Sequence, residues 1–171
     1  MNLAHEPSHT TPSRSLRARV LDPFRLAAIV LVVFTVGHTL GAVVSTPRFG
    51  AESDAVVAAM KSVHVVAQTA DCTWYGFYRS FGALISLWFV FSAVLAWHVG
   101  GLPAAARRAL AVPLWVFALC HTAGAALAWI YLFPAAQIFS TSVAALLAYG
   151  CIRDARRIGL PHPPSTKESL S

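Results

Sequence analysis

Two pairs of adjacent histidine and threonine residues lie inside long apolar stretches of this sequence. His38-Thr39 occurs within the segment GHTLG, and His121-Thr122 occurs within CHTAG. Histidine is costly in a hydrocarbon environment, so a histidine found there generally has a partner or a function. Neutral imidazole is a common ligand of haem iron and also a good hydrogen-bonding group between helices. The two pairs are therefore the candidate functional residues.

Two interpretations of these pairs remain open. In the first, the pairs are packing contacts that tie the first and third apolar stretches together, because G-x-x-x-G and small-x-x-x-small motifs let helices approach closely while His and Thr bond across the crossing. The small and polar residues that this interpretation assigns to packing are Gly37, Thr39, Gly41, Thr122 and Gly124. In the second, His38 and His121 are the two axial ligands of a b-type haem, and the neighbouring glycines leave room for the flat macrocycle.

The two pairs belong to a repeat with an offset of 83 residues. Nine of the 21 positions from Arg25 to Ser45 are identical to their counterparts in the second copy, which starts at Arg108. Each histidine follows its arginine by 13 residues, which is about 20 Å at helical rise. We therefore expect both imidazoles at one level, facing each other across the centre of a helical bundle.

Motifs for catalysis and for metal binding are missing from the sequence. All seven acidic residues lie outside the apolar stretches, which disfavours a proton-coupled transporter with a buried carboxylate. Neither G-x-S-x-G nor H-E-x-x-H occurs, and the three cysteines form no C-x-x-C pair. We assign no catalytic residue and no metal site, and an enzyme is the less favoured class.

The elements that must position the two pairs are membrane-spanning helices. The sequence is 57% apolar and 12% charged, which leaves too few charges to cover a soluble globule. About 20 apolar residues in a helix cover a hydrocarbon core of about 30 Å. Four such spans are predicted, at residues 24–45, 76–98, 109–133 and 135–152. The expected fold is all-α: an integral membrane four-helix bundle with up-down-up-down topology over residues 23–157.

The loop between the first two spans is expected to carry an amphipathic helix at residues 53–70, on the outer surface of the membrane. Its polar residues recur at helical spacing, from Asp54 through Lys61 to Asp71. Aromatic residues crowd into positions 74–78, as in the interfacial belt of a membrane protein. These aromatic residues, together with Arg79, could form the mouth of a site for a small lipophile or quinone.

The distribution of positive charge predicts the orientation of the spans. Ten basic residues fall on one side of the predicted membrane, against Arg48 and Lys61 on the other and Arg79 near the outer interface. This asymmetry places both termini in the cytoplasm. The net charge of +6 sits in these flanking segments, so we do not expect nucleic-acid binding. Residues 1–22 and 158–171 are predicted to be disordered cytoplasmic tails.

Several segments resemble a group of small bacterial four-helix membrane proteins of unknown function. They are GHTLG at residues 37–41, Ala59-Met60-Lys61, WYGFY at residues 74–78 and Phe81-Gly82, and the resemblance covers about residues 24–100. It implies a bacterial inner (plasma) membrane as the location, and no activity. The favoured hypothesis is a structural or assembly component whose partners are the lipid bilayer and either another membrane protein or further copies of itself. The alternatives are the haem-binding electron carrier and the small-lipophile or quinone binding protein.

Overall fold

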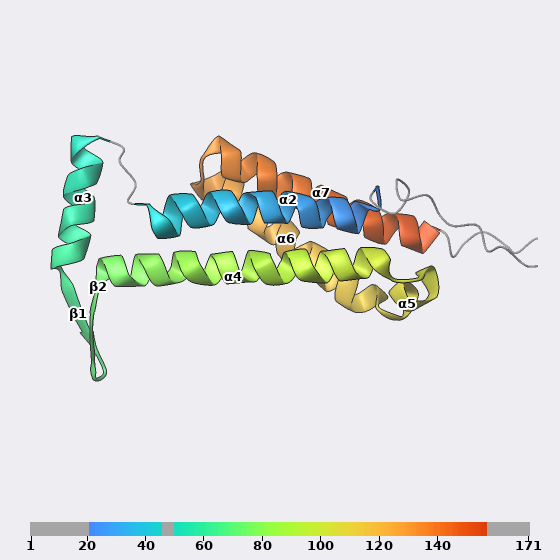
Figure 1. The fold of residues 1–171 in the computed structure, drawn as a ribbon, viewed down its shortest axis with the longest axis horizontal. Coiled ribbons are helices and arrows are strands. Elements are labelled where there is room, and N and C mark those ends of the chain that lie inside the picture. Colours follow the sequence, from blue (N-terminus) through green and yellow to red (C-terminus); the bar gives the residue numbers. More distant parts are fainter. Residues whose placement is uncertain (1–20, 46–49, 157–171) are drawn as a thin grey trace, which may run out of the picture.

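The computed structural model describes residues 21–45 and 50–156. Four of its helices are long and apolar enough to cross a membrane (Figure 1). They are α2 (Pro23–His38) with its π-helical continuation η1 (Thr39–Val44), α4 (Trp74–Gly101), α6 (Ala111–Tyr131) and α7 (Pro134–Arg156). The four predicted apolar helices are confirmed, and they indicate a multi-pass membrane protein. The predictions made for residues 1–20 and 157–171 lie outside the described residues.

Side chains at the helix ends explain where two of the long helices begin. Asp22 is the N-cap of α2, where its Oδ1 accepts a hydrogen bond from the Phe24 N–H at 3.1 Å. Pro23 follows at the first helical position, where the missing N–H costs nothing. Thr73 caps α4 in the same way, by accepting from the Gly76 N–H at 3.0 Å. These caps satisfy backbone donors that have no partner within the helix.

The last turns of the first span are wider than an α-helix. Residues Thr39–Val44 form the π-helix η1, which the Ser45 N–H closes by bonding to the Leu40 carbonyl five residues earlier, at 3.0 Å. The Ser45 hydroxyl also donates to that carbonyl, at 2.7 Å, and to the Gly41 carbonyl, at 2.9 Å. The span therefore ends by a side chain bonding back onto its own backbone. A π-helix at this place was not predicted.

Helix α2 is the central helix, because it packs closely against both α4 and α7, while α6 packs mainly on α7. The start of α2 meets the end of α4, where Arg25 crowds Gly100, and its continuation η1 meets the early part of α4 at Gly82. Helices α2 and α4 therefore run in opposite directions. In Figure 1, α6 lies behind α2 and α4 and crosses them obliquely.

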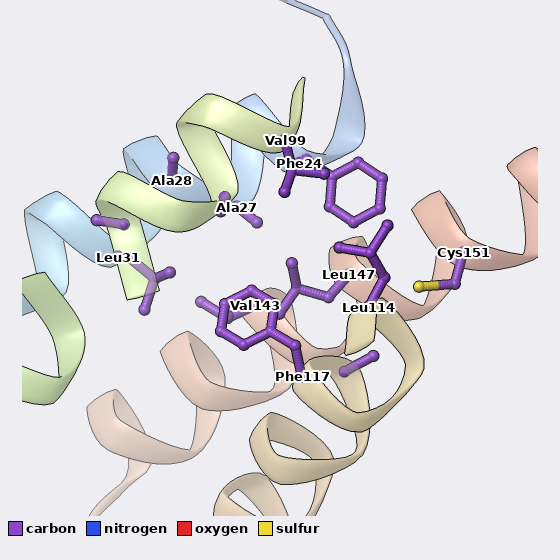
Figure 2. Close-up of a cluster of buried hydrophobic side chains, with 13 residues drawn as sticks. Phe24, Ala27, Ala28, Leu31, Val99, Leu114, Phe117, Val143, Leu147 and Cys151 are labelled. Atoms are coloured by element: carbon purple, nitrogen blue, oxygen red, sulfur yellow. The ribbon is translucent and has the colours of Figure 1, made fainter. Parts of the chain in front are cut away.

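The apolar core lies among all four long helices (Figure 2). Phe24 of α2 and Leu147 of α7 are fully buried, and Val99 of α4 and Phe117 of α6 join them. Phe24 packs against the backbone of α7 at Gly150, where an added Cβ would lie 2.8 Å from its ring. The absence of a side chain at this one position lets the two helices approach each other.

The predicted helix at residues 53–70 is wrong in its second half. Helix α3 (Ala51–Ser62) ends at Ser62, and the strands β1 (His64–Ala67) and β2 (Ala70–Thr73) then pair as an antiparallel hairpin. Adjacent valines at positions 65 and 66 favour a strand, and Gln68 adopts a positive φ of 56° in the turn. Figure 1 shows α3 and the hairpin lying across the end of the long helices. A short helix, α5 (Ala104–Ala109), connects α4 to α6.

Candidate functional site

His38 is hydrogen-bonded to a serine of α4. Its Nδ1 lies 3.1 Å from Ser86 Oγ, and the Thr39 hydroxyl donates to the same oxygen at 2.9 Å. Ser86 Oγ is thus the shared partner of the Thr39 hydroxyl and the imidazole, and the donor in its bond to His38 is set by the tautomer of that ring. The ring of Phe89 meets the imidazole edge-on, with 5.8 Å between the ring centres. This chain of hydroxyl groups ties the end of α2 to α4.

His121 makes an equivalent contact from α6. Its Nε2 lies 3.2 Å from Ser92 Oγ, and both side chains are buried. Trp88 stacks over the imidazole with 6.1 Å between the ring centres, and Phe117 meets it edge-on at 4.9 Å. Thr122 differs from Thr39, because its hydroxyl donates to the Ala118 carbonyl of its own helix at 2.9 Å.

The two copies of the repeat therefore share one partner, helix α4. In each copy a phenylalanine four residues before the histidine packs against the imidazole: Phe34 beside His38, and Phe117 beside His121. The sequence predicted that these residues tie the first span to the third. In the structure each imidazole is bonded to α4 instead, so the second span holds the first and the third.

The binding of one haem by both His38 and His121 stays a prediction. The hydrogen bonds of the two imidazoles to serines of α4 do not favour it. Their serine partners, Ser86 and Ser92, are six residues apart on α4, which is about 9 Å along its axis. The ring nitrogen that bonds is Nδ1 in His38 and Nε2 in His121. A common iron would need one nitrogen of each ring within about 2 Å of it. The serine bonds instead explain how both imidazoles are accommodated among apolar helices.

The glycines of the two motifs do not lie in helix crossings within the described part of the chain. A Cβ added at Gly37, Gly41 or Gly124 would meet nothing within 4 Å. The close approaches occur at other glycines, for example at Gly100, where an added Cβ would lie 2.5 Å from the side chain of Arg25. Among the described residues, the two motifs therefore do not pack spans one and three together. Their open sides face away from the rest of the described chain.

A buried group of two acidic and two basic residues was missed by the sequence analysis. Asp22 lies at the start of α2, Arg107 in α5, and Arg153 and Asp154 near the end of α7. Arg153 Nη2 lies 2.9 Å from Asp22 Oδ2 and 3.1 Å from Asp154 Oδ1. Arg107 Nε lies 2.7 Å from Asp154 Oδ2, although this contact is not directed along the N–H bond. We call these four residues the ion cluster.

The charges of the ion cluster balance, which explains how it can be buried. Two carboxylates face two guanidinium groups, and the side chains of Arg107, Asp22 and Asp154 are only 5%, 11% and 12% exposed. Buried charges are tolerated when they are paired and hydrogen-bonded. These residues lie in three separate flanking segments of the sequence. Their opposite charges were therefore the only sequence feature that could have indicated the cluster. It joins α2, α5 and α7 at one end of the molecule.

A groove lies at the start of α4, where β2 meets this helix, and thus at the other end of the molecule from the ion cluster. It has a volume of about 420 Å³ and is lined by Cys72, Thr73, Gly76, Phe77, Ser80, Phe81 and Leu84. We call it the β2–α4 groove. Arg79 was expected at the mouth of a lipophile site, but its guanidinium lies 5.8 Å from the ring of Tyr75. Tyr75 is about 180° around the helix from Leu84, so this cation faces away from the groove.

No group of three His, Cys, Asp or Glu side chains that could hold a metal ion occurs in residues 21–45 and 50–156. No protein-family model matches the chain, and no curated protein or solved structure shows significant similarity to it.

Proposed function

We propose that the chain is a four-span protein of a bacterial inner membrane, with alternating spans and both termini in the cytoplasm. Two observations support this orientation. The basic residues Arg107, Arg108, Arg153 and Arg156 all lie near the end of the molecule at which α2 begins. Helix α3 and the hairpin lie at the other end, with Lys61 as their one basic residue among those described. Short cytoplasmic segments are the ones enriched in Lys and Arg.

Reporter fusions test this orientation. Green fluorescent protein fused after Ser171 is expected to fluoresce, because it folds in the cytoplasm. Alkaline phosphatase inserted at the hairpin turn, after Gln68, is expected to be active, because it needs export. The reverse pattern would show that the orientation is wrong.

Within the membrane, the proposed role is that of a non-enzymatic assembly component. The observation that carries this proposal is the open space beside Gly37, Gly41 and Gly124. Small residues at four-residue spacing allow two transmembrane helices to approach closely, and this packing drives association in lipid. The chain has these motifs on the first span and on α6, but no described residue packs against their glycines. A helix from another chain would fill the same space.

The open surface of α2 has the shape that such a partner requires. Gly37 and Gly41 lie about one turn apart, and Val33 lies one turn before Gly37 on the same side of the helix. Val33 is exposed, and so are both glycines. We call these three residues, which run from α2 into the start of η1, the α2 glycine face. Branched side chains beside a shallow glycine surface provide the ridge and groove that a facing helix can pack against.

Substitutions on this face separate association from folding. Gly37→Leu adds bulk to the α2 glycine face without meeting any atom of the described chain. Val32→Leu is the matched control, because Val32 is also exposed but points about 140° away from Gly37. In native-gel electrophoresis of gently solubilised membranes, the wild type and Val32→Leu are expected to migrate as a complex larger than the 18.3 kDa monomer.

Gly37→Leu is expected to release the monomer while it keeps its helical circular dichroism spectrum. Mass spectrometry of the complex then distinguishes a second copy of the chain from a different membrane protein. A wild type that migrates only as a monomer, or a Gly37→Leu variant that stays in the complex, would contradict the proposed role.

A further inference from the structure

The β2–α4 groove lies on the side of α4 that faces away from α2. Gly82 and Ser86 mark the side of α4 that contacts the first span. Leu84 lies on the groove side, about 160° around the helix from both Ser86 and Gly82. The groove is therefore separate from the serine contacts of the two histidines. It is open to whatever surrounds the bundle.

An apolar strip of α4 continues the groove along the helix. Leu87 and Phe91 follow Leu84 on the same side, and all three side chains are well exposed. In a membrane-spanning helix such an exposed strip is the surface that meets lipid chains. The groove is thus continuous with the lipid-facing surface of the span. Its hollow shape distinguishes it from the rest of that surface.

The two ends of the groove differ in chemistry. At the β2 end it is lined by Cys72 and Thr73, which carry a thiol and a hydroxyl group, whereas Phe81 and Leu84 line the other end. Leu84 follows Thr73 by eleven positions, which is about 16 Å at helical rise. Half of a hydrocarbon core of about 30 Å is about 15 Å. The length therefore matches one leaflet.

We propose that the β2–α4 groove binds one phospholipid from the leaflet that surrounds the α3 end of the bundle. One acyl chain lies along Phe77, Phe81 and Leu84, and the glycerol ester region lies beside Cys72 and Thr73 at the β2 end. Hairpin strand β2 closes the groove above the ester region. This site is independent of the α2 glycine face, which lies on a different helix.

Native mass spectrometry of the full chain tests this site. The protein released from a mild detergent is expected to retain one phospholipid. Ser80→Phe places a ring in the middle of the groove and is expected to lose that phospholipid. Val90→Phe is the matched control, because Val90 is exposed on α4 but lies outside the groove. Its retained phospholipid should be unchanged.

Cys72 provides a second readout that does not depend on survival of the complex in the gas phase. The probe is N-ethylmaleimide, and the site of labelling is read by peptide mass spectrometry. After the protein is delipidated, added phosphatidylethanolamine at ten times its Kd occupies about 90% of the sites, so labelling of Cys72 should slow about tenfold. Labelling of Cys72 in the Ser80→Phe variant serves as the control and should not slow.

Each other outcome overturns the proposal. Retention of phospholipid by Ser80→Phe, or equal labelling of Cys72 with and without added phosphatidylethanolamine, would show that the groove is not the binding site. A retained quinone or other isoprenoid in place of a phospholipid would show that the assigned occupant is wrong. None of these results bears on the oligomeric state, so failure here is distinguishable from failure of the assembly role.

Discussion

Replacing Arg107 by methionine should destabilise the protein far more than the same change at the adjacent Arg108. Arg107 is 5% exposed and contacts both carboxylates of the ion cluster. Methionine removes one of the two positive charges of the ion cluster. Asp22 and Asp154 are then left to share Arg153. Removing one partner of a buried ion pair costs about 3 to 5 kcal/mol. We expect the lower value, about 3 kcal/mol, because the cluster lies at the end of the helices, close to water.

The control removes the same charge from the same short segment. Arg108 is exposed, and its Nε donates to the Ala104 carbonyl of its own helix at 3.4 Å. Its substitution should change the free energy of unfolding by less than about 0.5 kcal/mol. Both variants lower the positive charge of the segment equally, so an effect on membrane insertion would appear in both.

The assay is equilibrium unfolding in mixed micelles of dodecyl maltoside and sodium dodecyl sulfate, followed by tryptophan fluorescence and circular dichroism. A loss of about 3 kcal/mol corresponds to roughly a hundredfold increase in the unfolding equilibrium constant. Equal transitions for the Arg107 and Arg108 variants would refute the conclusion that the ion cluster holds α2, α5 and α7 together.

Three further predictions follow from the helix contacts. Substitution of glycine by alanine should change the free energy of unfolding of the monomer in opposite directions at two positions. Gly37→Ala should raise it by about 0.5 to 1 kcal/mol. Gly150→Ala should lower it, because the added Cβ would lie 2.8 Å from the Phe24 ring. The same sign at both positions in the micelle assay would contradict the assigned packing. Ser92→Ala should cost about 1 kcal/mol in that assay, since it leaves the buried His121 without its partner, and an unchanged transition would show that this bond contributes nothing. Purified protein should show no Soret band when it is expressed with added haem precursor, and a band that disappears in both the His38→Ala and His121→Ala variants would instead support haem ligation.

The four long helices could be predicted because their signal is local and strong. A run of about 20 apolar residues with flanking arginines has few alternatives in a protein of this composition. Most predicted ends fall within a few residues of the observed ones, as at Pro23 and Tyr131. The caps at Asp22 and Thr73 explain why α2 begins at Pro23 and α4 at Trp74, although the predicted boundaries did not depend on them.

The outer loop was predicted less well because two periodicities compete within it. Polar residues from Asp54 to Asp71 recur at helical spacing, which favoured one helix over residues 53–70. The helix stops at Ser62, since the valines at positions 65 and 66 and the turn at Gln68 favour a hairpin. His64 and Asp71, which the predicted helix placed on one surface, form a 2.8 Å contact across the two strands instead.

The candidate site was identified by residue type but not by partner. The repeat correctly singled out His38 and His121 as residues that need polar contacts. It could not show which helix supplies them, because Ser86 and Ser92 stand in an ordinary apolar span with no motif around them. The direction in which a glycine motif faces is likewise a property of the whole bundle, since it depends on the rotation of each helix about its axis.

The most direct test of the assembly role compares two adjacent valines in the membrane. Val33 belongs to the α2 glycine face and is 54% exposed, whereas Val32 is 53% exposed and points about 100° away. A photocrosslinking amino acid placed at either position lies at nearly the same depth in the bilayer. We predict a protein adduct from position 33 and none from position 32. Equal yields at the two positions, or an adduct from position 32 alone, would contradict the proposal that this face of α2 binds another helix.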